Sequence, residues 1–102
     1  MTITEKEWKA FTAIKDKALE RYCQSILDET ARLCTQTDKT PHERYLELRQ
    51  LIKERNKTMG KTFDGHSRSR AMLQLMLMRS MDLVDEDELQ AFDPDSLWDT
   101  EF

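Results

Sequence analysis

The chain has 102 residues, of which 38% are hydrophobic and 35% are charged, and its formal net charge is −4. Because it holds only two glycines and two prolines, the composition argues against an all-β fold, which needs many turn residues, and favours one all-α fold. No apolar run approaches the roughly 18 residues of a membrane span, and the opening MTITEKEWK has no apolar stretch typical of a signal peptide. We therefore expect a cytoplasmic protein that makes no membrane contact.

The first predicted helix covers residues 5–35. Thr4 and Glu7 have the spacing of a capping box, and Ile3 and Trp8 flank it as a hydrophobic staple. Apolar residues then recur at helical steps and predict one buried stripe. The stripe consists of Trp8, Phe11, Ile14, Ala18, Tyr22, Ile26 and Leu33, and it is widened by Leu19, Cys23 and Leu27.

The second predicted helix covers residues 41–62 and runs antiparallel to the first. Thr40 is its expected N-cap, Pro41 occupies its first position, and Glu43 completes a second capping box. Its apolar stripe consists of Tyr45, Leu48, Ile52, Met59 and Phe63.

The third predicted helix, residues 68–83, differs from the first two. Ten of the fourteen residues from Ala71 to Val84 are apolar, and they lie all round the helix. A helix that is apolar on every side is expected to be buried on every side, either inside the fold or between two subunits. Arg79 is the exception, and we expect it to lie near an acidic side chain of the first or the fourth helix.

The fourth predicted helix is short and acidic, at residues 85–92. Asp85 and Glu88 form a third capping box, and Leu89 and Phe92 are spaced to dock it on the bundle. We expect one helical domain over residues 1–93, followed by an acidic tail at 94–102.

No motif in the chain points to catalysis. The MGKT stretch at 59–62 lacks the first glycine of a phosphate loop. Cys23 and Cys34 are eleven residues apart, about 16 Å along a helix, so they cannot bridge or share a metal ion. His42 and His66 do not have metal-ligand spacing. We therefore predict no enzyme, no cofactor and no metal, and keep an enzyme with an unrecognised site as the second alternative.

Charge is distributed unevenly along the chain. Residues 39–79 hold ten basic and four acidic side chains, a net charge of +6, whereas residues 80–102 hold nine acidic and no basic ones. One interpretation is that the acidic end folds against, or near, the basic helix of its own chain or of a twofold mate. The alternative is nucleic-acid binding by the basic stretch 49–70. Its candidate residues are Arg49, Lys53, Arg55, Lys57, Lys61, Arg68 and Arg70.

We favour the first interpretation, a non-enzymatic protein–protein interaction or regulatory module that self-associates as a homodimer or takes a partner helix. Its predicted contact residues come from the third helix and from the tail, where apolar side chains stand among acids. They are Met72, Met76, Leu77, Leu97, Trp98 and Phe102. The tail residues either cover the chain's own bundle or serve as a peptide ligand for a partner.

Overall fold

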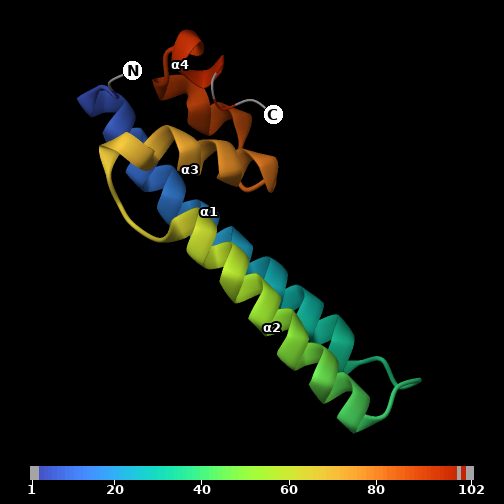
Figure 1. Cartoon of the computed structure of the whole chain (residues 1–102). Helices are drawn as coiled ribbons and strands as arrows, with labels where there is room; N and C mark the ends of the chain where they lie inside the picture. Colours follow the sequence, from blue (N-terminus) through green and yellow to red (C-terminus); the bar gives the residue numbers. More distant parts are fainter. Residues whose placement is uncertain (1–2, 99, 101–102) are drawn as a thin grey trace.

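The computed structural model describes residues 3–98 and 100, and this part of the chain contains helices and no strand, which confirms the all-α fold. The molecule is elongated, with extents of 52 × 24 × 21 Å, and α1 and α2 form its long antiparallel hairpin (Figure 1). The elements are α1 (Glu5–Cys34), α2 (Pro41–Phe63), α3 (Arg68–Ser80), the 3₁₀ helix η1 (Glu86–Ala91) and α4 (Pro94–Trp98).

Capping boxes fix the starts of α1 and α2 at the predicted residues. The Thr4 hydroxyl accepts the Glu7 N–H at 3.1 Å, and the Glu7 carboxylate accepts the Thr4 N–H at 3.0 Å. Thr40 and Glu43 exchange the same two bonds, each at 3.1 Å. The helix ends differ from the prediction by a single residue each: α1 stops at Cys34 and α2 continues to Phe63.

The third helix ends three residues before the predicted end. α3 closes after Ser80 in a Schellman motif, in which the Leu83 N–H donates to Met78 O and the Asp82 N–H donates to Arg79 O, both at 3.0 Å. Asp82 takes the left-handed conformation, with a φ of 58°. Leu83 and Met78 are both buried in the core, which supplies the apolar contact that accompanies this motif. The expectation of a helix through residue 83 was wrong because an aspartate fills the position where glycine usually marks the stop.

The predicted fourth helix is a 3₁₀ helix, η1, instead of an α-helix. The Glu88 carboxylate accepts the Asp85 N–H at 2.8 Å, so this part of the predicted capping box is present. Leu89 and Phe92 are both buried in the core, as predicted. They lie three residues apart, which is one turn of a 3₁₀ helix, so the tighter winding points both side chains the same way.

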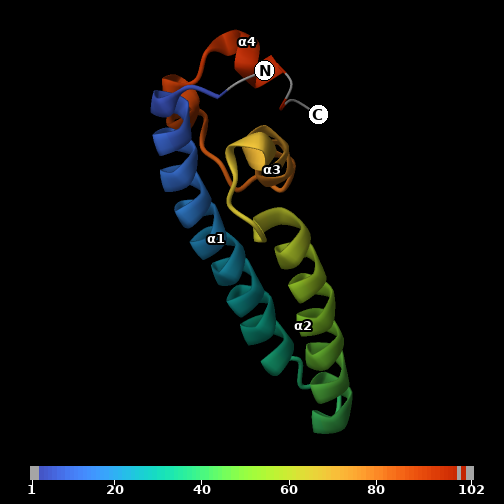
Figure 2. The same ribbon diagram turned by 60° about the vertical axis from the view of Figure 1, so that its left-hand side comes forward.

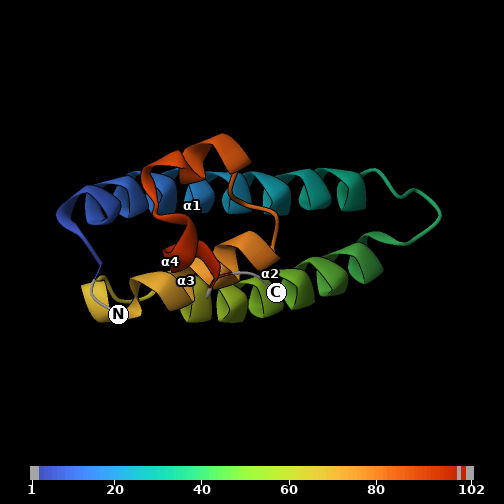
Figure 3. The same cartoon turned by 90° about the horizontal axis from the view of Figure 1, so that it is seen from above.

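The helices differ in length, and this difference shapes the molecule. At 1.5 Å per residue, α1 is about 45 Å long and α3 only about 20 Å. α3 and η1 lie over the half of the hairpin near the chain ends (Figure 2), and η1 lies beside α1 on the side away from α2 (Figure 3). The core is confined to that half and draws on every element except α2 and α4. It consists of Ile3, Phe11, Ile14, Ala18, Tyr22, Ile26, Ala71, Leu75, Met78, Leu83, Leu89 and Phe92.

α3 is not buried on every side, so that expectation was wrong for the single chain. One face, formed by Ala71, Gln74, Leu75 and Met78, is buried against the hairpin. On the opposite side Leu73 is 48% exposed. The physical reason is that α3 forms an outer layer, with α1 and α2 beneath it and no helix above most of it (Figure 2).

Candidate interaction surfaces

The predicted contact residues of α3 are only partly available to a partner. Met72, Met76 and Leu77 are all half-buried, and Met72 packs against the core together with Leu97. Phe102 and the side chain of Trp98 lie outside the described residues. The α3 surface therefore offers Leu73 as its one strongly exposed large apolar side chain among the described residues.

Arg79 fastens the acidic tail onto α3. Its Nη1 donates to the Thr100 hydroxyl at 2.6 Å, and Thr100 is fully buried. Its Nη2 lies 3.8 Å from the Glu86 carboxylate, which confirms the expectation that Arg79 has an acidic neighbour in the fourth element. Leu97 and Thr100 thus pack against the chain's own bundle, which favours a covering role for these residues.

The acidic end packs against α1 and not against the basic helix of its own chain. Arg21 of α1 donates to both oxygens of Glu88, at 2.7 and 3.2 Å, and to Leu83 O at 2.8 Å. It also reaches Asp85 at 3.3 Å. Hydrogen bonding from Arg21 lowers the pKa of Glu88, even though burial opposes that shift. The described parts of α2 and η1 make no contact with each other, so η1 does not fold against the basic helix of its own chain, although Asp82 of the acidic end lines a pocket together with Arg55 of α2.

The predicted nucleic-acid residues separate into two groups. Arg55 is bound to Glu29 across the hairpin, and Arg68 is bound to Glu5 at 2.6 Å, with its guanidinium over the Trp8 ring. Arg70 is exposed at the start of α3.

The remaining four, which we call the basic ridge, follow one another on α2 at intervals of four residues. All four are exposed, and none forms an ion pair within the described part of the chain. The basic ridge consists of Arg49, Lys53, Lys57 and Lys61.

Most of the exposed large apolar side chains of the described residues lie on the part of the hairpin that α3 does not reach. The last residues of the α3 turn, Met81 to Leu83, meet the hairpin at the level of Tyr22 and Arg55, so residues 26–52 form a two-helix arm beyond them (Figures 1 and 2). Four of the five exposed large apolar side chains of the described residues belong to this arm. They are Leu27 (61% exposed), Tyr45 (60%), Leu46 (46%) and Ile52 (39%).

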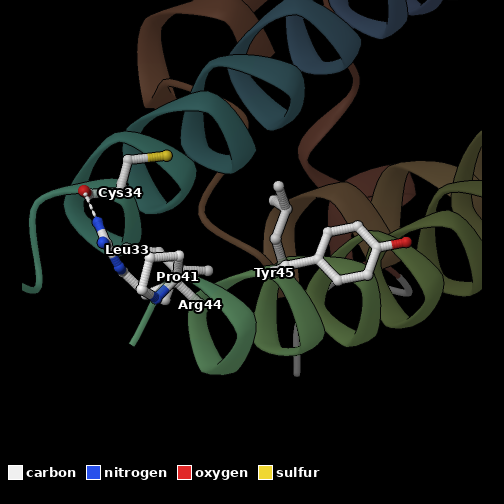
Figure 4. A pocket seen from close by; sticks show the side chains of 6 residues that line it. Leu33, Cys34, Pro41, Arg44 and Tyr45 are labelled. Carbon is white, nitrogen blue, oxygen red and sulfur yellow. Dashed lines mark hydrogen bonds between the residues drawn. The ribbon is translucent and has the colours of Figure 1, made fainter. Parts of the chain in front are cut away.

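An apolar groove crosses the arm where α1 ends and α2 begins (Figure 4). Its volume is about 280 Å³, and Leu33, Cys34, Pro41, Arg44, Tyr45 and Leu48 line it. The Arg44 guanidinium donates to Cys34 O at 2.6 Å, so its charge is held at a helix end that needs a donor.

The exposed side chains of both arm helices extend this groove. Leu27 precedes Cys34 by seven residues and Ile52 follows Tyr45 by seven, so each lies on the same side of its helix as the groove. We call this surface the arm face; it comprises Leu27, Leu33, Cys34, Tyr45, Leu48 and Ile52.

The arm face was missed at the sequence level, although two signals were present. The first was Leu27, which lies at the edge of the predicted stripe of the first helix and only widens it. The second was length: a third helix of 13 to 16 residues cannot cover a hairpin of 23 to 30 residues. Because the third helix has the highest share of apolar residues, the contact surface was predicted on that helix instead.

Side chains that could bind a metal ion do not cluster in the described residues. No three His, Cys, Asp or Glu side chains among them lie close enough to hold a metal ion. His42 is exposed, and the His66 ring packs 4.5 Å from that of Trp8. No helix in residues 3–98 combines the length and the apolar character needed to cross a bilayer.

Comparison of the chain with protein-family models, with curated proteins and with solved structures gave no match. Function is therefore argued from the surfaces described above.

Proposed function

We propose that this chain is a non-enzymatic protein–protein interaction module that self-associates through the arm face. The observation that carries the proposal is the position of the exposed apolar side chains, four of which lie on the one part of the fold that α3 and η1 leave uncovered. Two amphipathic helices bury only the seam between them, so a two-helix arm leaves apolar surface for another partner.

A second copy is the occupant that the chemistry of the arm face supports best. Tyr45, Leu48 and Ile52 of α2 have the three- and four-residue spacing, and Leu27 and Cys34 of α1 the seven-residue spacing, by which one hairpin packs on another in a four-helix bundle. In a twofold dimer the same face meets itself, so apolar side chains meet apolar side chains. Arg44 is the one charged side chain that lines the groove, and its Nη1 already binds Cys34 O.

The size of the arm face sets the expected affinity. The twelve residues from Pro41 to Ile52 span about 18 Å, and two helices side by side are about 20 Å wide. Pairing two such faces buries roughly 700 Å², which is below the standard size of a specific interface and typical of a weak one. We therefore expect a dissociation constant in the micromolar range, roughly 1–100 μM.

Light scattering across a concentration series tests the proposal. The wild-type chain should change from monomer to dimer between about 1 and 300 μM, given that affinity. The variant L27D/I52D should remain monomeric throughout this range. Both replaced side chains are exposed in the single chain, so its helical circular dichroism should not change.

Leu73→Asp provides the matched control, because Leu73 is also an exposed apolar residue but lies on α3. This variant should dimerise like the wild type. If Leu73→Asp dissociates the dimer and L27D/I52D does not, the interface lies on α3 and not on the arm face. If the wild-type chain is still a monomer at 300 μM, the proposal is wrong. The exposed thiol of Cys34 gives a second measurement, since its alkylation should slow as dimer forms.

A further inference from the structure

We propose that the basic ridge on α2 binds the phosphate backbone of double-stranded nucleic acid, a role separate from the self-association assigned to the arm face. The ridge carries four cations, Arg49, Lys53, Lys57 and Lys61, at equal steps of four residues. From first to last it covers about 18 Å of the helix. Because each step of four residues turns about 40° round the helix, the row is inclined to the helix axis and turns through about 120° from Arg49 to Lys61.

No contact within the described residues explains why α2 carries this row of cations. Eight of the twelve other basic side chains are engaged there: Lys17, Arg21, Lys39, Arg55, Arg68 and Arg79 form ion pairs, and Lys15 and Arg44 bind backbone carbonyls. Lys6, Lys9, Arg32 and Arg70 form neither kind of contact in the described residues, but they do not follow one another at regular helical steps. The four ridge residues form neither kind of contact. Like charges four residues apart destabilise a helix, so the row weakens α2 unless an outside anion neutralises it.

Nearby carboxylates do not neutralise the ridge. Glu54 lies next to Lys53 in the sequence, but its carboxylate accepts the Gln50 amide at 2.9 Å. Glu47 is paired with Lys39 at 2.8 Å. The large acidic segment is far from the row in the fold, because η1 lies beside α1 on the side away from α2 (Figure 3). At 0.1 M salt the screening length is about 10 Å, so this segment repels an anion on α2 only weakly.

Double-stranded nucleic acid fits the ridge better than the other polyanions do. Three of the four cations are lysines, which contact phosphates as point charges and carry no base information. No aromatic side chain lies between them on α2 to stack an unpaired base, which disfavours single strands. The chain's own acidic segment is a poorer ligand, since Asp85, Glu86 and Glu88 are already paired with Arg21 and Arg79.

The salt dependence of binding gives the proposal a quantitative test. Four phosphate contacts predict a slope of log affinity against log salt of about −3.6, a loss of roughly 150-fold between 50 and 200 mM salt. The probe is a fluorescent 24-base-pair DNA duplex of mixed sequence, titrated by anisotropy with the full chain. Because no base contacts are involved, duplexes of different sequence should bind alike.

Variants identify which residues make the contacts. K53Q/K57Q removes two of the four, so its slope should fall to about −1.8 and its affinity at 50 mM should fall by at least tenfold. K6Q/K9Q is the matched control: it removes two exposed lysines of α1, changes the net charge equally, and should bind like the wild type.

Three results would overturn the proposal: no binding at 50 mM salt, an unchanged slope in K53Q/K57Q, or equal losses in both double variants. Saturable binding of poly-glutamate or of anionic lipid vesicles, with no binding of the duplex, would assign the ridge to that polyanion and would also overturn it. The light-scattering result for the arm face does not decide these readings, because no residue of the ridge belongs to the arm face.

Discussion

Replacing Arg21 with Met should destabilise the fold by about 2 kcal/mol at neutral pH. Arg21 gives Glu88 two hydrogen bonds, and the Glu88 side chain is only 12% exposed. Without the arginine, that carboxylate keeps the Asp85 N–H and a lysine 3.7 Å away. Removing one partner of a fully buried pair costs about 3–5 kcal/mol, and exposed pairs contribute about 0–1 kcal/mol. The expected loss of about 2 kcal/mol lies between the costs for a buried and an exposed pair, because the Arg21 side chain is 35% exposed.

A double-mutant cycle isolates the contribution of the pair itself. Glu88→Gln keeps the shape of the side chain and removes its charge, so R21M, E88Q and the double variant complete the cycle. We expect a coupling energy of about 1–1.5 kcal/mol, since the two side chains touch directly. Unfolding should be measured in urea, which unlike guanidinium does not screen charge, and at one fixed protein concentration because self-association adds stability.

The coupling energy between Arg21 and Glu88 should fall as the pH is lowered. Hydrogen bonding from Arg21 lowers the pKa of Glu88 below its ordinary value of 4.5. A carboxyl whose pKa is lowered on folding contributes stability above its unfolded pKa and loses it as the pH falls through the folded value. The coupling should therefore be complete at pH 7 and decline below about pH 4.5.

A coupling energy below about 0.3 kcal/mol at pH 7, or one that is unchanged at pH 3, would refute this reasoning, because contacting pairs in a cycle are expected to exceed that value. Lys39 and Glu47 provide the comparison. They form an ion pair of similar length, 2.8 Å, at the loop end of the hairpin. Because that pair is exposed to solvent, its cycle should give a much smaller coupling.

Two further substitutions test the helix end and the buried carboxylate. Asp82→Gly should stabilise the fold by about 0.5–1 kcal/mol, seen as a higher melting temperature, because glycine takes the positive φ of 58° without strain; Asp82→Val should lower it. Glu7→Gln should cost about 1–2 kcal/mol in urea unfolding at pH 7. Burial raises the pKa of Glu7, but hydrogen bonds from Thr4, Asp93 and Ser96 together lower it below 4.5, so the cost should shrink as the pH falls below that value. An equal cost at pH 3 and pH 7 would contradict the assignment of Glu7 as a hydrogen-bonded carboxylate.

Local signals in the sequence predicted the helices well because the stabilising contacts are local. A capping box joins residues three apart, so Thr4–Glu7 and Thr40–Glu43 placed two helix starts correctly. The end of α3 was placed wrongly because the residue in the left-handed conformation that ends the helix is Asp82. Aspartate tolerates this conformation, but unlike glycine it does not indicate a helix end in the sequence.

Long-range charge pairing was beyond sequence reasoning. Composition showed a basic middle and an acidic end, and their attraction for each other was the simplest inference. Which cations meet which acids depends on how the helices are rotated and stacked, and η1 docks on the far side of α1, where Arg21 and Lys17 lie. The basic ridge was consequently left unpaired, and Arg55, counted among the nucleic-acid residues, was found bound to Glu29.

Glu7 completes its contacts with residues from both ends of the chain. One carboxylate oxygen accepts the Thr4 N–H in the cap of the first helix, and the other accepts the Asp93 N–H at 3.2 Å. During synthesis the first helix is therefore made long before its own N-terminal turn is fully bonded. Until residue 93 leaves the ribosome, the Glu7 oxygen that accepts the Asp93 N–H must stay in water. The first turn of α1 thus reaches its final form only after residue 93 has been made, which couples the start of the fold to a contact 86 residues later in the sequence.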